Sequence, residues 1–283
     1  MKGIVLAGGT GSRLYPLTVS VNKHLIPIYD KPMIFYPISV LLLAGIKEIL
    51  IITTKKDQNL FHNLLGNGDH LGCNFTYGIQ ENPNGIGEAF IIGEKFIGKE
   101  SVMLILGDNI IYGSGLSSIL NFKSENFAKI FPILVNDPER FGVAEYNDDG
   151  EIISIEEKPK LPKSKFAIPG IYYYPNDVIA IAKKIKPSDR GELEISSINS
   201  YYLKQNRLKA TNLPRGITWL DTGTPESLAD AIEFVKVIEK RTTKKIACLE
   251  EIAFIKGYIS QKKANQASFR YGKSSYADYV SKI

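Results

Sequence analysis

Residues 3–13, GIVLAGGTGSR, join a short apolar run to a glycine-rich turn that is followed by an arginine. The run from Gly3 to Ala7 is typical of a buried strand, and the GGTG turn at 8–11 predicts backbone N–H groups that can approach phosphate oxygens. A dinucleotide-binding G-x-G-x-x-G would need glycine at position 14, where this chain has Leu14. The segment therefore predicts an α/β fold that binds phosphate after its first strand, and it argues against a NAD-linked oxidoreductase.

Strand-like and helix-like segments alternate along the first half of the chain. Apolar, β-branched runs predict further strands at 48–53, 75–80, 102–106 and 129–135. Helices are expected between them, at 33–44, 58–65 and 87–96. This alternation is typical of a Rossmann-like, mostly parallel, twisted sheet with helices on both faces, in which ligands bind at the carboxyl ends of the strands.

The alternation of strand-like and helix-like segments ends at about position 142. Three strand-like runs follow one another closely, at 143–146, 152–157 and 168–174. We therefore expect a smaller, sheet-rich portion inserted into the α/β core. Helices are expected again at 176–184, 195–205 and 225–241, the last with Thr224 as its N-cap.

Composition excludes several classes of protein. The 283 residues carry 35 Lys and Arg against 30 Asp and Glu, and no basic stripe is visible, so nucleic-acid binding is not expected. Cys73 and Cys248 lie far apart without metal-ligand spacing, which disfavours a disulfide or a zinc site. The longest apolar stretch, 33–46, is too short to cross a bilayer. Because Met1 leads directly into the first strand, we expect no signal sequence, a cytoplasmic location and no membrane partner.

Two cations follow the glycine-rich turn. Arg13 and Lys23 are placed to neutralise a pyrophosphate leaving group. Any single basic residue is most often ordinary surface charge. Lys23, however, directly precedes the apolar segment His24-Leu25-Ile26-Pro27, a setting that favours a binding role.

Two carboxylates end apolar runs. Asp108, with Asn109 after it, follows VMLILG, and Asp221 ends the segment WLD. Each Asp alone would most often serve a turn or cap a helix. Since Mg²⁺ takes one or two carboxylates together with substrate phosphates, the pair predicts a magnesium site.

Other polar residues also fall at strand ends. Glu157 suits a sugar hydroxyl and Lys158 a sugar phosphate, with surface charge as the alternative for both. The amide of Gln80 can both donate to and accept from a pyrimidine edge. The RGELE segment at 190–194 predicts a loop and helix start near the sugar, although acidic residues are common in a first helical turn.

Taken together with Lys23, seven segments closely resemble the glucose-1-phosphate thymidylyltransferases, a sugar nucleotidyltransferase family: AGGTGSRLYPLT, YDKPM, LGDN, ERFGVAE, EEKP, RGELEI and WLDTGT. The resemblance runs in the same order from about position 1 to 259 and is specific as a set. It implies condensation of dTTP with α-D-glucose 1-phosphate to dTDP-glucose and pyrophosphate, toward dTDP-rhamnose and related deoxysugars of cell-surface polysaccharide. It also implies Mg²⁺ as cofactor and in-line attack without a covalent intermediate or a general base.

The resemblance also implies roles for individual residues. The implied catalytic residues are Arg13, Lys23, Asp108, Lys158 and Asp221, of which Asp108 and Asp221 would hold the metal. The implied nucleotide-binding residues are Gly8, Gly11, Ser12, Arg13, Lys23, His24, Gln80, Gly85 and Asp108. The implied sugar-binding residues are Asn109, Gly142, Glu157, Lys158 and Ile168. The core would span 1–241 with its sugar-binding portion mainly within 142–215, and 242–283 would be a helical segment at an oligomer interface, in a tetramer by resemblance.

Three positions depart from the family pattern. His24 stands where many members have a Gln that contacts the nucleotide, Pro169 replaces a Thr, and Ile255 replaces a basic residue. Neutral imidazole can still make one hydrogen bond to a nucleotide, while the alternative is a partly buried His24 packed beside Leu25. Many relatives bind dTDP-rhamnose as an inhibitor at a subunit interface, and Ile255 leaves that regulation open here.

Two other functions stay open at this stage. The same chemistry with UTP or another sugar 1-phosphate is physically easy, because thymine differs from uracil by one methyl group worth roughly 1 kcal/mol. A non-catalytic nucleotide-binding homologue would be expected to have lost a metal carboxylate or a phosphate cation. This chain keeps all of them.

Overall fold

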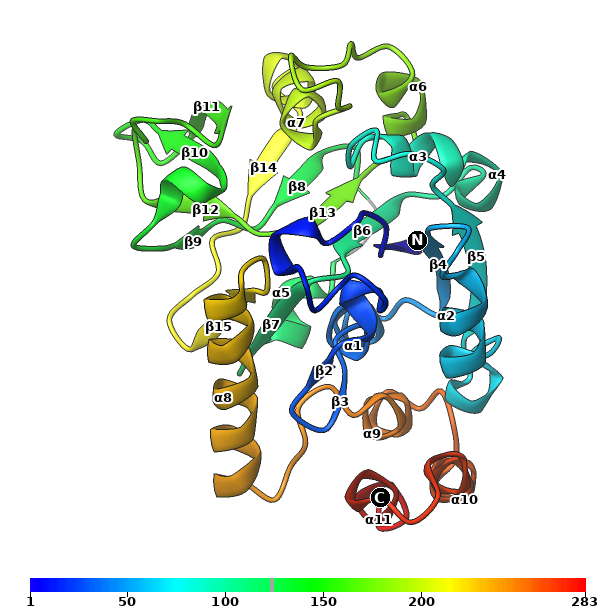
Figure 1. Cartoon of the computed structure of the whole chain (residues 1–283). Helices are drawn as coiled ribbons and strands as arrows, with labels where there is room; N and C mark the ends of the chain where they lie inside the picture. The colour runs from blue at the N-terminus through cyan, green and yellow to red at the C-terminus, as the bar shows by residue number, and fades with distance from the viewer. Residues whose placement is uncertain (123–124) are drawn as a thin grey trace.

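A seven-stranded sheet crosses the middle of the molecule (Figure 1) in the order β14-β8-β13-β6-β1-β4-β5. The computed structural model describes residues 1–122 and 125–283. The strands of the sheet are β1 (Lys2–Leu6), β4 (Glu48–Thr53), β5 (Asn74–Ile79), β6 (Val102–Leu106), β8 (Ala128–Ile130), β13 (Ile171–Tyr174) and β14 (Leu208–Ala210). β13 runs antiparallel to both of its neighbours, and the other pairs are parallel. The predicted mostly parallel sheet is confirmed.

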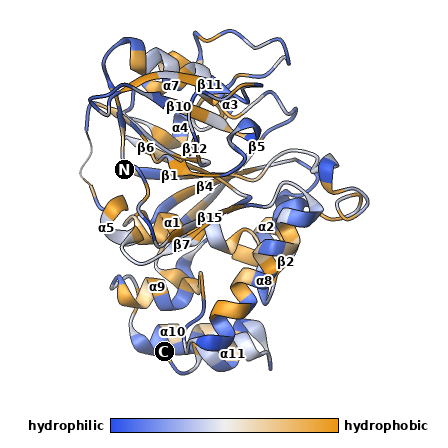
Figure 2. Cartoon of the chain, turned by 90° about the vertical axis from the view of Figure 1, so that its left-hand side faces the viewer, coloured by the Kyte–Doolittle hydropathy of each residue, from blue (hydrophilic) through white to orange (hydrophobic). Residues whose placement is uncertain are grey.

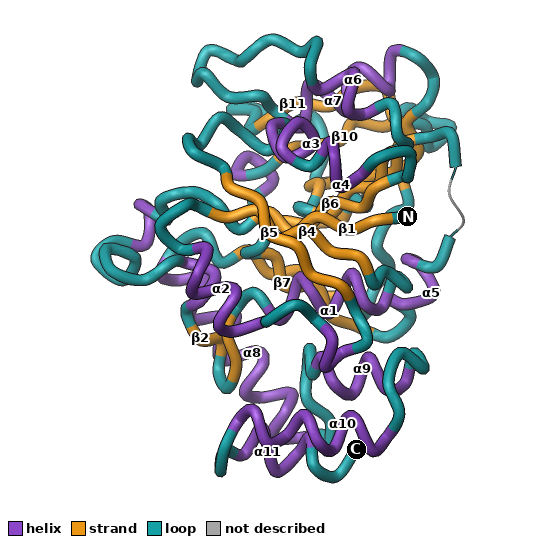
Figure 3. Tube along the Cα trace, turned by 90° about the vertical axis from the view of Figure 1, so that its right-hand side faces the viewer, coloured by secondary structure: helices purple, strands orange, loops and turns teal. Residues whose placement is uncertain are grey.

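Helices cover both faces of this sheet, as the edge-on view of Figure 3 shows. One face carries α1 (Phe35–Leu43), α2 (Gln58–Leu65) and α5 (Leu116–Leu120). The other face carries α3 (Glu88–Ile92), α4 (Glu94–Ile97), α6 (Val178–Ala182) and α7 (Ile195–Lys204). Successive residues of β4 point to opposite faces, so Ile49 and Ile51 pack with α1 while Leu50 and Ile52 pack with α3. The central strands are therefore apolar on both sides. Figure 2 shows hydrophobic residues, in orange, within these strands and in the helices next to them.

A second, four-stranded antiparallel sheet forms the smaller portion expected after position 142. Its order is β11-β10-β12-β9, made by Ile152–Glu157, Gly142–Tyr146, Phe166–Ile168 and Ile133–Leu134. Two predicted strands were wrong here, because the runs 129–135 and 168–174 each divide between the two sheets. The divisions fall at Pro132 and at Pro169–Gly170, and proline has no N–H with which to continue a ladder.

The prediction of one continuous helix at 87–96 was also wrong. The segment forms two short helices, α3 and α4, that meet at Gly93. A Cβ atom at Gly93 would lie 2.9 Å from the Ala89 carbonyl oxygen and 3.0 Å from Ile4 of β1. The glycine therefore allows close approach of the backbone to the sheet. The predicted helices at 58–65 and 225–241 have the bounds of α2 and α8 (Pro225–Arg241).

Two small antiparallel pairs complete the part of the fold that positions the site. β7 (Asn109–Gly113) follows β6 after only two residues and pairs with β15 (Ile217–Asp221). β2 (Pro27–Ile28) and β3 (Lys31–Pro32) make a hairpin between the 3-10 turn η2 (Lys23–Leu25) and α1. In the β7/β15 pair Asp221 lies opposite Asn109.

The C-terminal segment lies against the α1 side of the core, at the bottom of Figure 1. It contains α9 (Leu249–Ile255), α10 (Gln261–Ala267), the 3-10 turn η5 (Ser268–Tyr271) and α11 (Ser275–Val280). Ala253, Ala264 and Val280 share one apolar cluster with Phe35 and Ile38 of α1. Thus the helices within 242–283 pack against the core and share its apolar cluster. Within residues 1–122 and 125–283, each helix is too short or too polar to span a bilayer.

The N-cap of α8 provides a test of how this helix is anchored directly after Asp221. Thr224 Oγ1 accepts a hydrogen bond from Ser227 N at 3.2 Å, and Ser227 Oγ accepts one from Thr224 N at 3.0 Å. We expect Thr224→Ala to lower the free energy of unfolding by about 1 kcal/mol in urea denaturation, because the Ser227 N–H at the helix start loses its side-chain acceptor. Thr243→Ala, at an exposed site beyond the helix, is the control. Equal values for the two variants would contradict this role of Thr224.

Candidate active site

The glycine-rich turn follows β1 and leads into the 3-10 turn η1 (Ser12–Leu14). Gly11 has a positive φ of 61°, and a Cβ there would lie 3.1 Å from Thr18 and 3.3 Å from Lys23. At Gly8 a Cβ would lie 2.7 Å from Gln80 Oε1. Both glycines are therefore needed for close packing. They line a hollow of about 210 Å³, called the phosphate hollow below because the sequence predicts phosphate binding here, together with Gly9, Ser12, Arg13, Leu14, Lys23, His24, Asp108 and Gly223.

Lys23 and Asp108 form the central ion pair of this hollow. Lys23 Nζ donates to Asp108 Oδ2 at 2.5 Å, and the side chain of Lys23 is only 8% exposed. Burial by itself would raise the pKa of Asp108, but the Lys23 ammonium and a hydrogen bond from Asn109 outweigh it and hold that pKa well below its ordinary value. Asp108 is therefore ionised at any physiological pH.

His24 is buried next to this pair. Its backbone N–H donates to Asn22 Oδ1 at 2.9 Å, and its Nδ1 lies 2.9 Å from the same oxygen. Burial lowers the pKa of His24 to about 4, so the imidazole is neutral at physiological pH. Burial of His24 agrees with one of the two alternatives, and its place in the wall of the phosphate hollow leaves contact with a nucleotide as a prediction.

Gln80 and Gly85 lie together beside the glycine turn. Gln80 Nε2 donates to the Gly85 carbonyl at 3.2 Å and to Glu88 Oε2 at 2.8 Å. Gly85 has a φ of 100°, and a Cβ there would come within 2.6 Å of the Leu193 backbone. The loop that holds the base-reading candidates is thus fastened to the RGELE segment, which also receives the N–H of Gly87 at Leu193 O.

Asn109 ties three segments of the site to one another. Its Nδ2 donates to Asp108 Oδ1 at 3.0 Å, while its Oδ1 accepts from Gly170 N at 2.9 Å and from Trp219 Nε1 at 2.6 Å. Asn109 lines the pocket in which the sugar is expected. Its amide nevertheless has three protein partners.

The remaining sugar-site candidates form one row across the smaller sheet. Gly142 of β10 pairs with Glu157 of β11 on one side and with Ile168 of β12 on the other. A Cβ at Gly142 would lie 3.3 Å from Glu157 Oε2, so the glycine leaves room above the row. Burial raises the pKa of Glu157. Lys158 follows with a positive φ of 46°, and its N–H donates to the Phe141 carbonyl at 2.9 Å.

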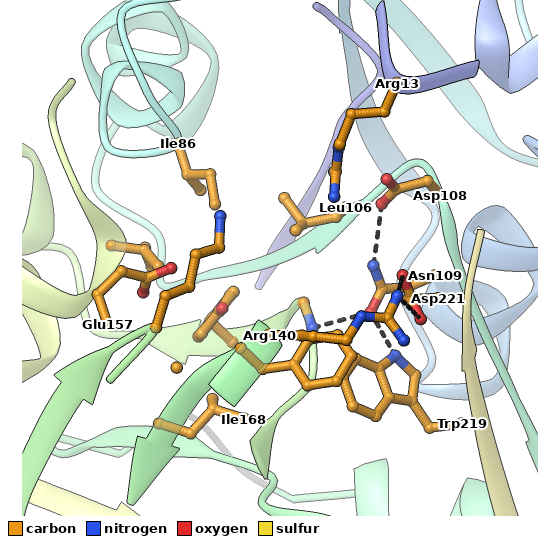
Figure 4. A pocket seen from close by; sticks show the side chains of 16 residues that line it. Arg13, Ile86, Leu106, Asp108, Asn109, Arg140, Glu157, Ile168, Trp219 and Asp221 are labelled. Atoms are coloured by element: carbon orange, nitrogen blue, oxygen red, sulfur yellow. Dashed lines mark hydrogen bonds and ion pairs between the residues drawn. The ribbon is translucent and has the colours of Figure 1, made fainter. Parts of the chain in front are cut away.

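A second hollow, of about 220 Å³ and called the sugar-side hollow below, opens above this row (Figure 4). Glu157 stands on one side of it and Arg13 on the other. Arg13 and Asp108 line both this hollow and the phosphate hollow. The structure therefore gathers thirteen of the sequence-predicted site residues around two adjoining hollows: Gly8, Gly11, Ser12, Arg13, Lys23, His24, Asp108, Asn109, Gly142, Glu157, Lys158, Ile168 and Asp221. Gln80 and Gly85 lie beside them rather than in their walls.

Sequence reasoning assigned no role to Arg140, Phe141 or Trp219, which also line the sugar-side hollow. Arg140 Nη2 donates to both carboxylate oxygens of Asp221, at 3.1 and 2.9 Å. The rings of Phe141 and Trp219 meet at a centroid distance of 4.6 Å. The signal was present, because Arg140 and Phe141 stand in ERFGVAE and Trp219 in WLDTGT. Only folding brings the two segments together.

Fold and site together are those of an α/β protein in which a glycine-lined hollow with two cations, Arg13 and Lys23, adjoins a second polar hollow. The family described as "Nucleotidyl transferase" matches residues 2–237. A protein of Neisseria meningitidis named glucose-1-phosphate thymidylyltransferase is 48% identical, with 100% of this chain and 99% of that protein covered. One of Mycobacterium tuberculosis with the same name is 48% identical, over 99% and 98% of the two chains.

A solved structure agrees with these relatives. The structure of a putative glucose-1-phosphate thymidylyltransferase from Bacillus anthracis, in complex with a sucrose, aligns with a TM-score of 0.77 at 44% identity. The alignment covers 83% of this chain and 94% of that one. The chain belongs to the glucose-1-phosphate thymidylyltransferases of the nucleotidyl transferase family.

The buried neutral state of His24 predicts an acid-sensitive stability. Because the pKa of His24 is about 4 in the folded chain against 6.5 ordinarily, the unfolded chain binds the extra proton as the pH falls through this window. The contribution of neutral His24 to the free energy of unfolding is thus fully present above about pH 6.5 and is lost as the pH falls toward 4. His70, whose pKa burial also lowers to about 4, contributes in the same way.

We expect His24→Gln to reduce the loss of unfolding free energy between pH 7 and pH 5 by about 2 kcal/mol, as measured by urea denaturation at both values. His62→Gln, which changes an exposed imidazole, is the matched control and should leave the loss unchanged. If His24→Gln lost as much stability as the unchanged protein, His24 would not be held neutral by burial.

Proposed function

We propose that this enzyme joins dTTP to α-D-glucose 1-phosphate and releases pyrophosphate, giving dTDP-glucose. The observation that carries the proposal is that the phosphate hollow and the sugar-side hollow share Arg13 and Asp108. A nucleotide in the first hollow and a sugar phosphate in the second would meet at these two residues. The names of the full-length relatives supply the identity of the two substrates.

Asp108 and Asp221 fit a magnesium ion by position and by chemistry. Pairing of β7 with β15 puts Asp221 opposite Asn109, one residue from Asp108, and both carboxylates line the same hollow. Among the described residues no group of three or more His, Cys, Asp or Glu side chains is arranged to hold a metal. Water and substrate phosphates would complete the shell, as is usual for Mg²⁺. When bound, the ion supplies neutralisation of the phosphate charges that repel one another.

The chain's own residues would orient the nucleotide. The turn at Gly8 and Gly11 would let the backbone approach the phosphates, and Lys23, which Asp108 holds beside the turn, would add an ammonium. Arg13, which lines both hollows, would neutralise charge as the bond from the α-phosphorus to the pyrophosphate oxygen breaks. Gln80, Gly85 and His24 would contact the base or the adjoining nucleotide.

The sugar phosphate would bind across the smaller sheet. Glu157 would accept hydrogen bonds from sugar hydroxyls, while Gly142 and Ile168 would form the floor beneath the ring. Lys158 would pair with the phosphate, whose oxygen attacks the α-phosphorus in line. Since that oxygen is already ionised, no general base and no covalent enzyme intermediate are required.

Further parts of the proposal concern organisation. We assign the sugar-binding portion to about 142–215 and an oligomer contact, in a tetramer by resemblance, to 242–283. Ile255, at 70% exposed, is one apolar side chain that such a contact would cover. A cytoplasmic location, and partners limited to the two substrates and other copies of the chain, remain predictions.

Nucleotide preference tests the proposed function against its closest alternative. Pyrophosphate release would be measured with glucose 1-phosphate, Mg²⁺ and each of dTTP, UTP, CTP, ATP and GTP, with sugar-free and EDTA controls. We expect dTTP to give the highest kcat/KM. A preference for UTP would keep the chemistry and change the base, whereas no release with any triphosphate would refute the assignment.

Lys158 tests the position of the sugar phosphate. We expect Lys158→Gln to raise the KM for glucose 1-phosphate by roughly ten- to a hundredfold, because a hydrogen bond between charged groups is lost, and to leave the KM for dTTP nearly unchanged. Lys160→Gln, at an exposed lysine two residues further on, is the matched control. An unchanged dependence on glucose 1-phosphate would reject the role of Lys158.

A further inference from the structure

Arg140 occupies a position that none of the roles above explains. It ends the 3-10 turn η4 (Pro138–Arg140), just before β10, and its guanidinium bridges two carboxylates. Nη1 donates to Asp137 Oδ2 at 2.6 Å, and Nη2 donates to Asp221 at 2.9 and 3.1 Å. The N–H of Gly223 donates to the same Asp221 at 3.2 Å. Both oxygens of Asp221 therefore already have a donor.

A divalent cation at Asp221 and a guanidinium at Asp221 are in conflict. The guanidinium is permanently charged, so it cannot lose a proton to relieve the repulsion from a nearby metal ion. The side chain of Asp221 is 20% exposed and that of Arg140 is 36% exposed. At such partial burial, Asp221 without any counter-ion would be an incompletely solvated charge, and two cations on it would repel strongly.

The surroundings give Arg140 a place to remain after it leaves Asp221. Asp137, its second partner, is the more exposed carboxylate at 43%. A small hollow of about 150 Å³ lies beside Arg140 and is lined by Asp137, Ser227 and Asp230 among others. Ser227 Oγ is taken up by the N-cap of α8, but the carboxylates of Asp137 and Asp230 can accept the hydrogen bonds that Nη2 no longer makes to Asp221.

We propose that Arg140 is the counter-ion of Asp221 in the metal-free enzyme and that a divalent cation displaces it while Asp137 keeps hold of it. This inference rests on the proposed metal site. It makes Arg140 a positioning residue that lowers metal affinity and holds the Asp221 carboxylate in place until the cation arrives. A purely structural arginine joining η4 to β15 would affect stability but would not set the affinity for the metal.

Binding of Mn²⁺ to the full chain tests this without any turnover. Mn²⁺ accepts the same oxygen ligands as Mg²⁺, and its free concentration is measured directly by electron paramagnetic resonance. We expect Arg140→Gln to bind Mn²⁺ on the order of tenfold more tightly, since the cation no longer has to break a charged hydrogen-bonded contact. Arg140→Lys keeps the positive charge but loses the two-pronged guanidinium, so its affinity for Mn²⁺ should lie between those of the unchanged protein and Arg140→Gln. Arg241→Gln, which removes an exposed arginine at the end of α8, should bind as the unchanged protein does.

Asp221→Asn separates this inference from the proposed metal site. If Asp221→Asn leaves Mn²⁺ affinity unchanged, the metal site itself is wrong and the inference is overturned with it. If Asp221→Asn weakens binding but neither Arg140 variant tightens it, the metal site stands and the inference fails. The two substitutions are then combined. If Arg140→Gln no longer tightens Mn²⁺ binding when Asp221→Asn is also present, the inference is supported. An equal gain in that background would overturn it, because Arg140 would then act by general charge rather than through Asp221.

Discussion

The buried amide of Asn109 is the constraint on which the rest of the site depends. With 4% of its surface exposed, it joins the end of β6, the crossing between β12 and β13 at Gly170, and β15 at Trp219. A Cβ at Gly170 would lie 2.9 Å from Asn109 Nδ2, so only glycine allows this approach. Through this one side chain the turn that carries Asp108 and the strand that carries Asp221 are tied to the segment that enters β13 from the smaller sheet.

Charge at the site is organised before any substrate arrives. Lys23 and Asp108 are paired at low exposure, and each would be an uncompensated charge without the other. His24 beside them is neutral because burial disfavours its protonated form. The ammonium of Lys23 is therefore held beside the glycine turn before any ligand binds, which is what electrostatic preorganisation requires.

The two sheets meet because the chain passes between them twice. Pro132 lies between β8 and β9, and Pro169 with Gly170 lies between β12 and β13. The chain leaves β8 of the central sheet for β9 of the smaller sheet at the first passage, and it returns from β12 of the smaller sheet to β13 of the central sheet at the second. As a result the row Glu157, Gly142 and Ile168 borders the hollow that also contains the carboxyl end of β6. Pro169, a departure from the family pattern, is compatible with this passage because no ladder hydrogen bond is required there.

Sequence by itself determined the features that depend on residues close together along the chain. The alternating runs gave β4, β6 and β11 at their predicted bounds, the periodicity and caps gave α2 and α8, and the glycine turn after β1 placed the phosphate hollow. Motifs also named most residues that line the two hollows. These properties are local, since periodicity, turn chemistry and capping act over a few residues.

Only the tertiary structure decided which sheet each strand joins and which charges meet. The run 168–174 is uniformly strand-like, and its division depends on the partners that β12 and β13 find at distant positions. The pairing of Arg140 with Asp221 spans 81 residues, and that of Lys23 with Asp108 spans 85. Neither side chain carries a local signal for its partner, because strand register and long-range packing, rather than sequence spacing, bring such groups within hydrogen-bond distance.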